Sequence, residues 1–130
     1  MISVDNLADA IMEELLNYSE EVTEKVKNAA DIVAKEVNEV IKAKVTFEEP
    51  TGKYVKAFRI KTTVNTKYNK TNTWHVTNGQ YRLTHLLESG HALRGGGRTR
   101  SYPHIKFGQE LAEKRMEELT RKAVKDANGN

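Results

Sequence analysis

Histidines and a run of glycines are the residues of this chain whose types could support chemistry. His85, Glu88 and His91 look like a set of metal ligands, because imidazole and carboxylate groups bind divalent cations. On a helix, however, residues three and six apart rotate progressively away from one another, unlike the i,i+4 histidine pair of zinc proteases. Gly90 is also expected to end the helix before His91. We therefore expect no metal site.

The glycine run, residues 95–97, could present backbone N–H groups to a phosphate. It lacks the Gly-Lys-Ser/Thr ending of a P-loop, and it is not expected to lie between a buried strand and a helix start. No serine stands in a nucleophile-elbow pattern, and no pair of carboxylates stands out as acid and base. The chain contains no cysteine, which excludes disulfides and thiolate metal sites. We expect a protein that is not an enzyme and uses no cofactor.

The stretch around these glycines and Arg94, Arg98 and Arg100, here called the Gly-Arg loop, is better interpreted as a binding loop. Glycine adopts positive φ at little cost, while Pro103 fixes its own φ and directs Tyr102 toward an extended conformation. The arginines of the loop carry planar guanidinium groups suited to bidentate contacts with carboxylates or phosphates. Tyr102, Pro103 and Ile105 are expected to anchor the loop on the core. The residues expected at an assembly interface are His91, Arg94, Gly95, Gly96, Gly97, Arg98, Arg100 and His104.

The segment over residues 1–43 is predicted to be helical, because apolar or small residues recur there at steps averaging 3.6 residues. Ser19, followed by Glu20 and Glu21, could begin a second helix, so the pattern leaves open one long helix or two. A helix of forty residues would be about 60 Å long, more than a domain of this size covers by itself. It should therefore bend or pack on a neighbour.

A β region is predicted over residues 44–84, where the apolar pattern changes period. Asn78-Gly79 is the strongest hairpin signal, because a type I′ turn needs positive φ twice. These patterns predict an antiparallel sheet of about four strands. The expected strands cover residues 45–47, 54–64 and 73–77 and begin again at residue 81, with turns at residues 49–52 and 69–72.

Two further helices complete the prediction. Thr84 is expected to cap a short helix that runs through Glu88, and this helix and the Gly-Arg loop together occupy residues 85–106. A C-terminal helix is expected within residues 107–127, starting near Gln109 and packing on the sheet. The fold class is thus α+β, and the 130 residues suit a single domain, 1–130.

The net charge of +3 hides a division along the chain. Residues 1–43 hold ten acidic and four basic side chains, residues 44–106 hold three and twelve, and residues 107–130 hold five of each. Such asymmetry suits subunits that stack an acidic surface against a basic one, although a solvated charged face is the ordinary alternative. Acidic candidates to receive the arginines are Glu13, Glu14, Glu20, Glu21 and Glu24.

The basic middle region also supports an alternative function, a nucleic-acid-binding module. Its lysines and arginines are interleaved with Tyr54, Tyr68, Trp74 and Tyr81, which could stack on bases. The competing interpretation places these rings in the core and the lysines in solvent.

Three short stretches resemble the tail-component family of long-tailed bacteriophages and prophages. They are Leu-Leu-Glu-Ser-Gly-His at residues 86–91, the Gly-rich basic run at residues 94–98, and Tyr-Pro-His-Ile at residues 102–105. The family often has Pro-Ala soon after the His-Ile pair, whereas Lys106, Phe107 and Gly108 follow here.

This resemblance implies a structural virion protein that joins head and tail, as a neck, tail-completion or tail-terminator ring. It implies a homo-oligomer, for which the family's symmetric rings suggest six subunits. The implied partners are further copies of the chain, neighbouring head-closure and tail-tube proteins and, without sequence specificity, packaged DNA.

The expected location is the virion neck, after assembly in the host cytoplasm. Asp5 and Asp9 stand where a signal peptide would be basic, and no apolar run reaches the ~18 residues that a membrane span needs. We expect no membrane contact.

Overall fold

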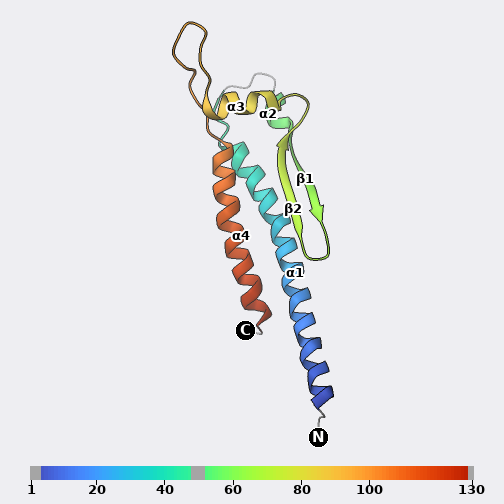
Figure 1. Ribbon diagram of the computed structural model, residues 1–130. Helices are drawn as coiled ribbons and strands as arrows, with labels where there is room; N and C mark the ends of the chain where they lie inside the picture. The colour runs from blue at the N-terminus through green and yellow to red at the C-terminus, as the bar shows by residue number, and fades with distance from the viewer. Residues whose placement is uncertain (1–3, 48–51, 129–130) are drawn as a thin grey trace.

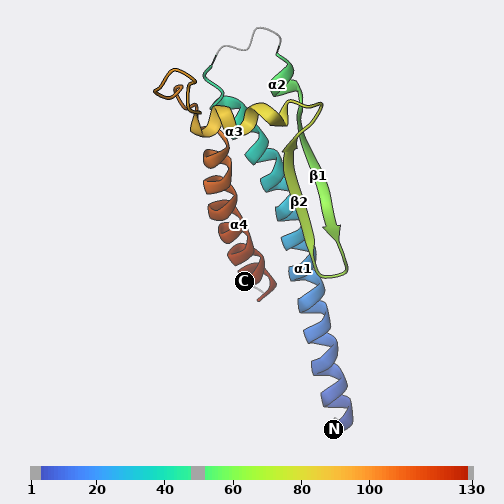
Figure 2. The same cartoon turned by 45° about the horizontal axis from the view of Figure 1, so that its top comes forward.

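The computed structural model describes residues 4–47 and 52–128 and has an α+β fold, as predicted. Helix α1 is central: α4 lies along one side of it and the β1–β2 hairpin along another (Figures 1 and 2). The short helix α3 crosses the end of this assembly. The elements are α1 (Val4–Ala43), α2 (Lys53–Lys56), β1 (Phe58–Asn65), β2 (Lys70–Val76), α3 (Tyr81–Ser89) and α4 (Ile105–Ala127).

Helix α1 is a single helix, so Ser19 does not begin a second one. Residues 4–43 contain neither glycine nor proline, the two residues that most disfavour a helix interior. Among the side chains of α1 whose burial the structure describes, those in the core lie in the C-terminal half, where Ala29, Val33, Val37 and Ile41 are buried. Helix α4 approaches this half closely at Gly108, where an added Cβ would lie 2.7 Å from the Ile41 side chain.

Polar side-chain contacts join the β1–β2 hairpin to α1. Its strands pair antiparallel from Phe58 opposite Val76 to Asn65 opposite Lys70. The indole N–H of Trp74 donates to the Asn38 side chain at 3.0 Å, and the Lys70 ammonium lies 2.8 Å from a carboxylate oxygen of Asp31.

The prediction of about four strands was wrong, since the described part of the chain holds two. Residues 45–47 form no strand, because the Phe47 ring packs between Tyr54 and Tyr102 in the core. The long strand expected over residues 54–64 begins as helix α2, and its turn falls at residues 66–69. The turn expected at residues 49–52 lies outside the described residues, apart from Gly52.

Asn78 and Gly79 have φ of 58° and 76°, both positive as a type I′ turn needs. The chain nevertheless continues into α3 and forms no returning strand at residue 81. Helix α4 begins at Ile105, earlier than expected, and packs along α1, not on the sheet.

Candidate assembly interface

The junction between α3 and α4 is held by one carboxylate. Glu88, near the end of α3, accepts hydrogen bonds from the backbone N–H groups of His104, Ile105 and Lys106 at 3.0, 3.0 and 3.1 Å. These are donors that the first turn of a helix cannot satisfy internally, so Glu88 caps α4 from another helix. Burial alone would raise the pKa of the Glu88 carboxyl, but these bonds together hold it below its ordinary value.

His104 lies directly beneath this cap, with 0% of its surface exposed. Its Nδ1 is 2.7 Å from the Tyr102 carbonyl oxygen, which can only accept, so Nδ1 carries a proton. Its Nε2 lies 2.7 Å from the Tyr54 hydroxyl. His104 was expected at an interface, whereas its ring is enclosed within the fold of one copy.

Residues 91–99 form a protruding hairpin, here called the arm (Figure 1). The His91 carbonyl accepts from the Thr99 N–H at 2.8 Å, the Gly97 carbonyl from the Leu93 N–H at 2.9 Å, and Ala92 pairs with Arg98. Gly96 and Gly97 have φ of 102° and 78°, which closes the tip. The binding loop expected here therefore has the backbone pairing of a small hairpin.

The polar residues of the arm differ in whether they contact the rest of the chain. Arg98 reaches back to the Gly90 carbonyl at 3.3 Å, and the Arg100 guanidinium lies over the Tyr102 ring at 5.5 Å. His91 closes the base of the arm through Thr99. Arg94, exposed at the tip, has no partner within the described ranges 4–47 and 52–128, and it is the arginine best placed to reach another molecule.

A second surface lies at the opposite end of the molecule, where α1 continues beyond everything that covers it (Figures 1 and 2). The Lys25–Asp126 ion pair at 3.9 Å and the bond from the Lys27 ammonium to the Thr66 carbonyl at 2.6 Å mark where α4 and the hairpin end. We call residues 8–19 the projecting segment. Its exposed apolar side chains are Ile11, Met12, Leu15 and Leu16, at 49%, 57%, 58% and 57% exposure.

The sequence predicted that the long helix would bend or pack on a neighbour, but it did not locate the part that projects. Two signals could have found it. The predicted helix was longer than the rest of the domain could cover. In addition, no lysine or arginine precedes Lys25, so every charged side chain in this part of the helix is acidic.

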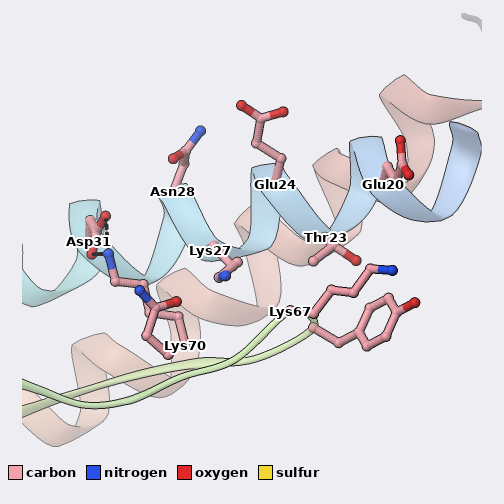
Figure 3. Close-up of a pocket in the computed structure, with 10 residues that line it drawn as sticks. Glu20, Thr23, Glu24, Lys27, Asn28, Asp31, Lys67 and Lys70 are labelled. Carbon is pink, nitrogen blue, oxygen red and sulfur yellow. Dashed lines mark hydrogen bonds and ion pairs between the residues drawn. The ribbon is translucent and has the colours of Figure 1, made fainter.

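The hairpin tip and α1 enclose a shallow pocket of about 380 Å³ (Figure 3). Its walls carry three acidic side chains and three lysines, and the Lys70 ammonium points at Asp31. The bonds from Lys70 and Asn72 lower the pKa of the Asp31 carboxyl. Because the charges are balanced and partly paired, this pocket has no evident preference for an anion or a cation.

The aromatic residues of the basic region do not share one face. Tyr54 is buried, and Trp74 is turned onto α1, where it bonds Asn38. Tyr68 and Tyr81 are exposed, at the hairpin tip and at the start of α3. A continuous stacking platform for nucleic-acid bases is therefore not formed by these four rings.

Among residues 4–47 and 52–128, no group of three histidine, aspartate or glutamate side chains could hold a metal ion. Glu88, which sequence reasoning considered only as a ligand, serves as a helix cap instead. No helix within the part of the chain that the structure describes is both long and apolar enough to cross a membrane.

The described residues form an α+β fold with two protruding parts, the arm and the projecting segment. Comparisons with protein-family models, curated proteins and solved structures gave no match to this chain.

Proposed function

We propose that this chain is a structural virion protein of a tailed phage or prophage, a ring subunit that completes the tail or joins it to the head. The observation that supports this best is the projecting segment, because a stable monomer rarely leaves a contiguous apolar helix face uncovered. The ordered arm at the other end offers Arg94 to a second neighbour.

The proposal has a direct test. Light scattering over a range of protein and salt concentrations should detect a closed oligomer, and negative-stain images should show a ring with a central hole. In the phage or lysogen that carries the gene, its deletion should yield separate filled heads and free tails. Normal infectious particles from the deletion strain would refute the proposal.

A nucleic-acid-binding module remains the second candidate. Arg59 and Lys61 are exposed on β1, and residues 52–87 contain no acidic side chain. Such a module would bind DNA with an affinity that falls steeply as salt rises, because binding releases counterions. A filter-binding series with mixed-sequence DNA distinguishes it from a virion subunit, for which we expect little binding at physiological salt.

A further inference from the structure

A group of cationic side chains surrounds a pocket where α2 leads into β1. The pocket has a volume of about 450 Å³ and is lined by Lys53, Lys56, Ala57, Arg59, Asn78 and Gln80, which we call the basic pocket. Its volume lies within the range of small-molecule sites. No acidic side chain lines it, and residues 52–87 as a whole contain none. The charged residues around this space are therefore all positive.

The two sides of the basic pocket are joined by backbone that is anchored in the fold. One side is α2 and the start of β1, and the other is the turn that follows β2 (Figure 2). The N–H and the hydroxyl of Thr77 both donate to the Ala57 carbonyl, at 2.9 and 3.1 Å, and so hold this turn against the end of α2. Tyr54 and Ala57 are each 1% exposed, so α2 is fixed to the core while its lysines remain exposed.

Arg59 is held in one orientation by neighbouring carbonyl groups. Its Nη1 donates to the carbonyl oxygens of Lys56 and Phe58, the latter at 2.8 Å. Within residues 4–47 and 52–128, Nε and Nη2 make no hydrogen bond. Nε–H and one Nη2–H form an edge of the guanidinium group that can pair bidentately with a phosphate. This edge is available to a ligand.

Asn78 and Gln80 add uncharged donors to the same pocket. Neither side chain has a hydrogen-bond partner in the part of the chain that the structure describes. An amide NH₂ group can donate to a phosphate oxygen. Cations and amide donors around one space suit an anion with several oxygens, because each oxygen can accept from a different side chain.

We propose that the basic pocket binds a phosphate group, either of a polyphosphate or of a nucleic-acid backbone. Arg59 pairs with it bidentately, while Lys53 and Lys56 neutralise its charge. This inference goes beyond the proposed function, because neither the arm nor the projecting segment takes part in it. A failure to bind phosphate would leave the ring proposal standing, and a monomeric protein would leave the basic pocket standing.

Tripolyphosphate is the probe, and calorimetric titration of the full-length protein measures its affinity. The variant K53Q/K56Q should bind about tenfold more weakly, because it loses two charge-assisted contacts. R59K keeps the charge but lacks the planar fork, and it should bind about threefold more weakly. The control K122Q/K125Q removes two lysines from exposed α4 positions and should stay within about twofold of the wild type, since distant exposed charges are screened. Equal weakening by K53Q/K56Q and the control would overturn the site.

Chemical-shift mapping on the wild type locates the site without relying on any variant. Addition of tripolyphosphate should shift the backbone N–H signals of residues 52–59 and 77–80 more than those elsewhere. Shifts spread evenly over the lysines and arginines of the chain would overturn the proposal. Circular dichroism and thermal melts establish that each variant is folded.

Competition with a short DNA duplex of mixed sequence distinguishes the two sources of phosphate. A duplex that displaces tripolyphosphate, and that K53Q/K56Q binds more weakly, would identify a nucleic-acid backbone as the ligand. Bound tripolyphosphate that the duplex does not displace would identify a free polyphosphate. If neither probe binds at low ionic strength, where phosphate contacts are strongest, the proposal is wrong.

Discussion

At the scale of single residues, Glu88 holds the junction from which the arm protrudes. It accepts three backbone N–H groups at the start of α4 and lies 3.1 Å from the His104 ring. The side chain thereby joins the end of α3 to the start of α4, the two elements between which the arm is held. The Tyr102 N–H, bonded to the Leu87 carbonyl at 2.6 Å, closes the same junction. The direction of the arm therefore depends on residues outside it.

The variant Glu88→Gln should lower the free energy of unfolding by about 1 kcal/mol, because it removes the negative charge of the cap. Caps at helix ends stabilise a protein by roughly 0.5–2 kcal/mol. Urea unfolding measures this loss. Glu113→Gln, an exposed position on α4, is the matched control and should change stability by less than about 0.5 kcal/mol. Equal stability of the two variants would show that the cap contributes nothing.

Acid titration of the same variant tests the charge of the cap. The pKa of the Glu88 carboxyl is lower in the folded chain than its ordinary value of 4.5. Its contribution is therefore present above pH 4.5 and is lost as the pH falls through the folded pKa. The wild type should lose stability on acidification more steeply than Glu88→Gln, measured by thermal melts between neutral pH and about pH 3. Parallel curves would contradict the assignment.

At the scale of elements, the sequence predicted what depends on local pattern. The 3.6-residue period gave α1 and α4, and two positive-φ residues were expected at Asn78-Gly79. The short helix expected through Glu88 is present within α3, but α3 begins at Tyr81, where a returning strand was expected. The bond between Glu88 and the His104 N–H, which holds the end of α3, joins residues 16 apart in sequence and is not encoded in a local pattern. The strand expected at residues 45–47 failed for a similar reason, since the Phe47 ring is held by residues far along the chain.

The same distinction applies to the candidate site. Glycines and arginines predicted a binding loop, but the pattern could not separate Arg94 at the tip from Arg98, which is held by backbone carbonyls. It also placed His104 at a surface although the ring is buried. Burial of a single polar ring depends on tertiary contacts that no spacing encodes.

Gly90, at the base of the arm, leads to a prediction for which Gly95 provides the control. Gly90 has φ of 68°, and an added Cβ would lie 2.6 Å from the Thr99 carbonyl oxygen. Gly90→Ala should therefore lower the free energy of unfolding by about 2 kcal/mol, from backbone strain and the clash together. Gly95 has open space around it and no positive φ, so Gly95→Ala should have an effect below about 0.5 kcal/mol. Similar destabilisation by both substitutions would contradict this account of the arm.

At the scale of the whole molecule, the buried core and the exposed apolar side chains lie in different parts of α1. The buried residues of α1 all lie from Ala29 onward among those described, packed with α4 and the hairpin. Within one copy, the apolar side chains Ile11, Met12, Leu15 and Leu16 of the projecting segment are 49–58% exposed. Charge reversal on its acidic side should therefore leave the fold unchanged, whereas the Arg115 and Glu36 pair, at 2.9 Å and 3.0 Å, lies where α4 meets the core half.

Removal of residues 1–21 tests whether this part of α1 contributes to the stability of the fold or to self-association. The truncated chain should unfold cooperatively with a free energy within about 1 kcal/mol of the full-length monomer. The reason is that residues 8–21, the part of the lost stretch whose burial the structure describes, contain no buried apolar side chain. Oligomers that exclude the unfolded chain are stabilised by mass action. The melting temperature of the full-length protein should therefore rise with protein concentration, while that of the truncated chain should stay constant. A concentration-dependent melting temperature in both would locate the subunit contact elsewhere, and a loss of several kcal/mol on truncation would mean that the segment belongs to the core after all.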